Sequence, residues 1–82
     1  MAAVVFRIPS GSKFVVTGAY AVDPIEVDAL AHLHDMAKRS KSKPKVLNSK
    51  GDLWEVRFRK SEDAILFALA TSGFRKQFAP GH

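Results

Sequence analysis

One segment, residues 53–60, constrains the fold of this chain more than any other, because its side chains alternate between apolar and charged. The two sets are Trp54, Val56 and Phe58 on one side and Glu55, Arg57 and Arg59 on the other. A period of two is that of a β-strand with one face in a core and the other in water. A lone strand cannot bury its apolar face, so the chain must supply partner strands and a layer that covers one side of the resulting sheet.

Two segments predict the helices of that covering layer. Asp23 and Pro24 resemble a helix start, an N-cap acid followed by proline, and the apolar side chains of residues 24–39 share one arc of a helical wheel. Ser61 is a candidate N-cap for a second helix, which continues through the apolar run 64–70 to Gly73 as a C′ glycine. This second helix is apolar on nearly every side, so its pattern does not indicate which side is buried.

Two hairpins complete the predicted fold. Residues 3–9 and 13–22 are rich in β-branched and aromatic side chains and flank a Ser-Gly-Ser turn, so we expect them to pair with each other. The larger side chains of the second of these strands are expected to face the core, and they are Phe14, Val16, Tyr20 and Val22. A short strand at 44–47 is expected to pair with 53–60 through a four-residue loop at 48–51.

The resulting order, β-β-α-β-β-α, predicts an α+β fold with an antiparallel sheet of three to four strands and two helices packed on one face. A chain of 82 residues has material for one hydrophobic core. We therefore expect a single domain over residues 1–82, with a basic loop at about 38–51 and a frayed C-terminal tail at 79–82.

The positive charge is concentrated in one stretch. The chain has 13 Lys and Arg against 8 Asp and Glu, and residues 38–50 contain no acid. The cations of this stretch are Lys38, Arg39, Lys41, Lys43, Lys45 and Lys50. Concentrated positive charge attracts polyanions, so we expect nucleic acid, or an acidic protein surface of a nucleic-acid-processing complex, to bind there and on the sheet face of Arg57 and Arg59. The alternative is a solvated, mobile connector whose lysines serve solubility.

No residue pattern in the sequence indicates a particular enzymatic reaction. The chain has no cysteine, which excludes disulfides, thiolate zinc sites and cysteine nucleophiles. His32 and His34 are two residues apart, so on a helix they point about 200° away from each other and cannot share one metal ion. The serines lie in no recognisable catalytic motif. We therefore expect a non-enzymatic protein with no metal and no cofactor.

The C-terminal region favours a second class of function. Phe67, Phe74 and Phe78 could form the contact of a protein–protein interaction or inhibitor module, including a homodimer. No segment approaches the roughly 20 apolar residues that cross a bilayer. The N-terminus lacks the basic start of a signal peptide. We therefore expect a soluble, cytoplasmic protein with no membrane partner.

The stretch W-E-V-R-F-R-K-S-E-D-A-I-L-F, residues 54–67, resembles a strand-to-helix unit of small uncharacterised phage-encoded proteins, W-x-x-x-F-x-x-x-x-D-A-x-x-F. This resemblance implies a short viral protein that acts by binding. Its partner would be host machinery, such as a nucleic-acid-processing complex in the host cytoplasm, or the virion, of which it would be a small structural protein.

Overall fold

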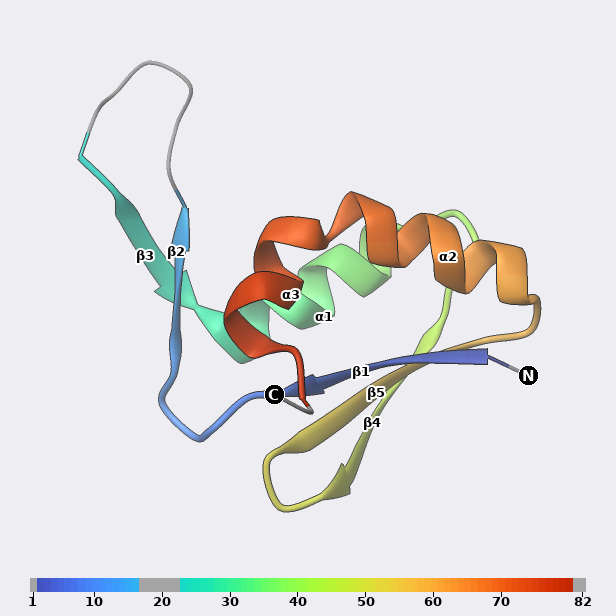
Figure 1. Ribbon diagram of the computed structural model, residues 1–82, viewed down its shortest axis with the longest axis horizontal. Helices are drawn as coiled ribbons and strands as arrows, with labels where there is room; N and C mark the ends of the chain where they lie inside the picture. The colour runs from blue at the N-terminus through green and yellow to red at the C-terminus, as the bar shows by residue number, and fades with distance from the viewer. Residues whose placement is uncertain (1, 17–22, 81–82) are drawn as a thin grey trace.

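The computed structural model describes residues 2–16 and 23–80, and it confirms the α+β class. These residues form five strands and three helices in the order β1-β2-β3-α1-β4-β5-α2-α3 (Figure 1). The strands are Ala2–Arg7 (β1), Lys13–Val16 (β2), Ile25–Asp28 (β3), Lys45–Lys50 (β4) and Leu53–Phe58 (β5). The helices are Ala29–Arg39 (α1), Ser61–Ala70 (α2) and Ser72–Phe78 (α3).

Strand β5 is the centre of a three-stranded antiparallel sheet with the order β1-β5-β4. Its Val56 is aligned with Val4 of β1 and with Val46 of β4. Val56 and Phe58 are buried, and Trp54 is half-buried against the same core. The alternation of residues 53–60 therefore predicted correctly which face of this strand packs inward.

The first predicted hairpin is wrong. β1 pairs with β5, while β2 pairs with β3 in a separate two-stranded sheet that projects from the body (Figure 1). The expected turn is present, with Gly11 at a φ of +80°, but it directs the chain away from β1. Pairing with β5 lets Val4 and Phe6 be buried under the helices, which an isolated two-stranded ribbon cannot achieve. Tyr20 and Val22, predicted to face the core, lie outside the described residues.

The first helix begins later than the sequence predicts. Residues Ile25–Asp28 form β3, and the N-cap is Asp28 rather than Asp23. The Asp28 carboxylate accepts a hydrogen bond from the Ala31 backbone N–H at 2.9 Å. Ile25 is 63% exposed, so the apolar arc that favoured a longer helix has no core to contact at its start. The predicted end at Arg39 is confirmed.

The second hairpin is confirmed, with a longer strand and a shorter connection than predicted. Only Gly51 and Asp52 separate β4 from β5, and Gly51 has a φ of +58°, which favours glycine. The side-chain amide of Asn48 donates to the carbonyls of Gly51 and Leu53 at 3.0 and 2.9 Å. A register shift between Asn48 and Lys50 accommodates these contacts, so residues predicted as a loop continue the strand.

The C-terminal region contains two helices instead of one. The N-cap of α2 is Lys60, without a side-chain bond, and Gly73 lies inside α3 rather than at a C′ position, so both predicted boundaries are corrected. The bend between the helices is at Thr71, whose Oγ1 donates to the Phe67 carbonyl at 2.8 Å. Because Thr71 is buried, this hydrogen bond satisfies a hydroxyl that has left water.

The predicted tail begins with a residue that is attached to α3. The Ala79 backbone N–H donates to the Arg75 carbonyl at 2.8 Å. Residues 81–82 lie outside the described chain.

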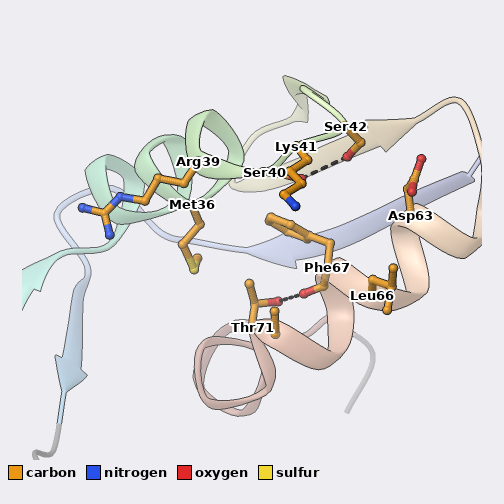
Figure 2. Close-up of a pocket in the computed structure, with 10 residues that line it drawn as sticks. Met36, Arg39, Ser40, Lys41, Ser42, Asp63, Leu66, Phe67 and Thr71 are labelled. Atoms are coloured by element: carbon orange, nitrogen blue, oxygen red, sulfur yellow. Dashed lines mark hydrogen bonds between the residues drawn. The ribbon is translucent and has the colours of Figure 1, made fainter.

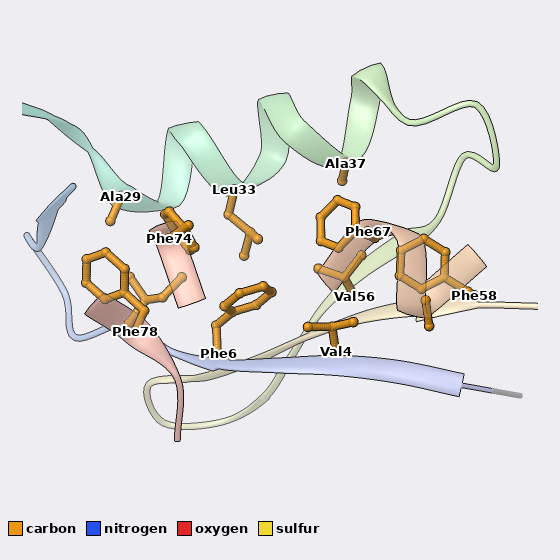
Figure 3. Packing of buried hydrophobic residues seen from close by; sticks show 12 residues of the cluster. Val4, Phe6, Ala29, Leu33, Ala37, Val56, Phe58, Phe67, Phe74 and Phe78 are labelled. Carbon is orange, nitrogen blue, oxygen red and sulfur yellow. The ribbon is translucent and has the colours of Figure 1, made fainter. Parts of the chain in front are cut away.

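The helices pack on one face of the three-stranded sheet, as predicted (Figure 3). Side chains from β1 and β5 point toward them and form one core that contains five phenylalanines. Phe74 is at its centre, and the centroid of its ring lies 5.3 Å from that of Phe6, 5.0 Å from that of Phe14 and 4.8 Å from that of Phe78. Within residues 2–16 and 23–80, no helix is long and apolar enough to cross a bilayer.

Candidate functional site

A cationic cleft lies where the connection between α1 and β4 meets the end of β5. Its volume is about 550 Å³. Four of the predicted cations line it, and they are Lys43, Lys45, Arg57 and Arg59. They come from two segments that the sequence separates by more than ten residues, so the sheet brings together the basic stretch and the basic strand face. We call this feature the cationic cleft.

The strand register places two like charges opposite each other in the cationic cleft. Lys45 of β4 is aligned with Arg57 of β5. Directly opposed like charges destabilise a sheet, because their Cβ atoms are only about 5 Å apart. Arg57 has a partner in Glu55, at 3.0 Å between Nη2 and Oε2, whereas Lys45 and Arg59 form no ion pair with any described residue. Glu55 therefore compensates the charge of Arg57, whereas the charge of Lys45 is left for an anion to compensate.

The connection between α1 and β4 is held by polar contacts of its own. The Ser40 backbone N–H donates to the Ala37 carbonyl, and that of Lys43 donates to the Ser40 carbonyl, both at 3.2 Å. Lys43 has a φ of +50°, which is uncommon for a residue with a Cβ. Its Nζ donates at 3.1 Å to the carbonyl of Lys38, an exposed residue in the last turn of α1, where carbonyls lack helical partners. Lys43 therefore stabilises the wall of the cationic cleft as well as charging it.

The other predicted cations do not line the cationic cleft. Arg39 and Lys41 line a different groove, of about 400 Å³, between α1 and α2, together with Asp63 (Figure 2). Lys50 is at the opposite end of β4 from Lys45, about 17 Å away along an extended strand. The structure thus divides the cations of the basic stretch among the cationic cleft, the groove between α1 and α2 and the far end of β4, while Lys38 is exposed in the last turn of α1.

The aromatic residues of the alternative interface are core residues in this structure. Phe67, Phe74 and Phe78 are only 6%, 1% and 8% exposed, which corrects their assignment to a contact surface. The large apolar side chains that α2 exposes instead are Ile65, Leu66 and Leu69. A helix that is apolar on all sides carries no periodic signal to separate its packed side from its open side, so the sequence could not distinguish the two sets.

The histidines of α1 contact aromatic rings. His32 stacks on Phe14 with centroids 4.9 Å apart, and His34 lies against Trp54 at 5.9 Å in an edge-on arrangement. Among the residues that the structure describes, no three potential metal-ligating side chains gather in one place.

Comparison of the chain with protein-family models, with curated proteins and with solved structures finds no match.

Proposed function

We propose that this protein is a nucleic-acid-binding module that holds phosphate groups in the cationic cleft. The observation that supports this most strongly is the meeting of Lys43, Lys45, Arg57 and Arg59 around one cleft. Lysine and arginine are the side chains that most often bind phosphate oxygens, through charge-assisted hydrogen bonds. Lys45, which lies opposite Arg57 and has no ion-pair partner among the described residues, would gain a counter-charge from a bound phosphate.

Binding of this kind depends on the backbone rather than on the bases. Contacts to phosphate position a protein on nucleic acid without reading its sequence. We therefore expect similar affinities for oligonucleotides of unrelated sequence and a strong dependence on salt. Each phosphate that the protein neutralises contributes about −0.9 to the slope of log K against log salt on duplex DNA, and about −0.7 on single strands.

A pair of matched variants tests the proposal. Lys45→Gln/Arg59→Gln removes two of the three cleft cations that have no ion-pair partner among the described residues, and it leaves the third, Lys43, to stabilise the turn. Lys13→Gln/Lys50→Gln removes the same charge from β2 and from the far end of β4. Fluorescence anisotropy with labelled random-sequence DNA and RNA, over a range of salt concentrations, measures affinity and slope for both.

The cleft variant is expected to flatten the salt slope by about one to two units, and the control variant by clearly less. Equal effects of the two variants would show that charge acts diffusely and would remove the cleft from the proposal. A wild-type protein with no salt-dependent affinity for either DNA or RNA would refute the nucleic-acid function, and an acidic protein surface would then become the favoured partner.

A further inference from the structure

Three large apolar side chains form a ridge along the outer side of α2. Ile65, Leu66 and Leu69 are 60%, 64% and 68% exposed. Their spacing places them on one stripe of the helix. Single exposed leucines are ordinary on protein surfaces, whereas a contiguous exposed apolar stripe is a candidate contact for a partner. We call this stripe the α2 ridge.

A groove runs along each side of the α2 ridge. The groove between α1 and α2, of about 400 Å³, is lined by Met36 and by Leu66 of the ridge itself, together with the charged residues Arg39, Lys41 and Asp63 (Figure 2). The groove between α2 and the edge strand β1, of about 480 Å³, is lined by Ala3, Ile65 and Ala68. Helices pack by inserting the ridge of one into the groove of another. A surface that presents both features is complementary to a copy of itself.

The charged residues of α2 and α3 themselves have opposite signs at the two ends of the α2 ridge. Glu62 and Asp63 occupy the first turn of α2, whereas Arg75 and Lys76 follow it on α3. A two-fold axis through the middle of the ridge makes the two α2 helices antiparallel. The acidic end of each copy then approaches the basic end of the other, which is the charge arrangement that favours association.

The same side of the molecule contains the less protected edge of the sheet. β1 carries no charged side chain before Arg7, whereas β4, the opposite edge, carries Lys45 and Lys50. Lysine on an edge strand discourages pairing with other chains. A partner seated on the α2 ridge would also cover part of β1, because both line the same groove.

From these features we propose that two copies of this chain associate through the α2 ridge, about a two-fold axis near Leu66. The ridge of each copy lies in the grooves of the other. The cationic cleft is lined by β4, the end of β5 and the connection between α1 and β4, and by no residue of α2.

Sedimentation equilibrium and native mass spectrometry over a series of protein concentrations test this dimer. We expect the wild-type protein to form dimers that dissociate on dilution. Leu69→Glu should weaken association about tenfold or more, because it places a charge at the centre of the contact. Ile25→Glu is the matched control, since Ile25 is 63% exposed on β3 and lies away from the ridge. Circular dichroism should show both variants folded.

A cross-linking experiment tests the position of the axis. The chain has no cysteine, so Leu66→Cys introduces the sole thiol. Beside a two-fold axis this thiol meets its own copy, and mild oxidation should give a covalent dimer in high yield, whereas Ile25→Cys should not. A wild-type protein that is monomeric at every concentration, or equal behaviour of the ridge and control variants, would overturn the proposal. Neither result depends on nucleic-acid binding.

Discussion

Replacing Phe74 with leucine tests how the core joins the body of the protein to the projecting β2–β3 sheet. Phe74 is 1% exposed and lies within aromatic contact distance of four rings. These rings come from β1, β2, α1 and α3, and they belong to Phe6, Phe14, His32 and Phe78. Leucine keeps most of the buried apolar surface but loses all four aromatic contacts.

The expected cost follows from those contacts. Each aromatic pair contributes about 0.5–1.5 kcal/mol beyond its buried area, and pairs that share one ring are not additive, so we expect Phe74→Leu to lower the free energy of unfolding by about 2–3 kcal/mol. Phe78→Leu is the matched control, because Phe78 is 8% exposed and pairs with Phe74 alone among the described rings. Its expected cost is about 1 kcal/mol.

Urea unfolding followed by circular dichroism measures both costs, provided that the m-value is unchanged between variants. A domain of this size has a total stability of roughly 4–12 kcal/mol, so both variants should remain folded. Equal costs for the two substitutions would refute the central role of Phe74. No loss in either variant would show that these rings are not packed as described.

Three further predictions concern individual contacts. Asp28→Ala should lower the free energy of unfolding by about 1 kcal/mol, because the Ala31 N–H loses its capping acceptor. Thermal melts should show this loss relative to Asp28→Asn, which keeps an acceptor. The Gln77 side chain accepts a hydrogen bond from the Val15 N–H at 3.2 Å and donates one to the Val15 carbonyl at 3.1 Å. Gln77→Ala should therefore speed hydrogen exchange of the Val15 amide, and unchanged exchange there would contradict the contact. Trp54→Ala should cost about 2 kcal/mol in urea unfolding, less than the 3–5 kcal/mol of a fully buried aromatic, because Trp54 is half-buried.

Some features of this fold could be predicted from the sequence because they depend on neighbouring residues alone. The alternation of residues 53–60 identifies β5 and its buried face, and the apolar run after Lys60 identifies α2. The end of α1 at Arg39 follows from the loss of the apolar period and the cluster of cations. In each case the local pattern and the tertiary environment favour the same conformation, so one can be inferred from the other.

Strand pairing was decided by the tertiary structure. A turn at Gly11 fits a β1–β2 hairpin as well as it fits the observed chain reversal. What distinguishes the two is the burial of Val4 and Phe6, which requires β5 and the helices from the other half of the chain. The start of α1 was decided in the same way, since Ile25–Asp28 could form a helical turn but pairs with β2 instead.

The candidate sites, too, were identified in part from the sequence and in part only by the tertiary structure. Charge is a property of composition, so the sequence alone identified the cations of the basic stretch and of β5. Which of them meet in one cleft depends on the alignment of Lys45 with Arg57 across two strands. Likewise, the sequence of α2 contains both the buried Phe67 and the exposed Leu66, and only the position of the helix on the sheet separates them. Whether a side chain is buried, and which side chains lie close to it, depends on segments that are distant in the sequence. These properties are therefore determined only when the segments pack together.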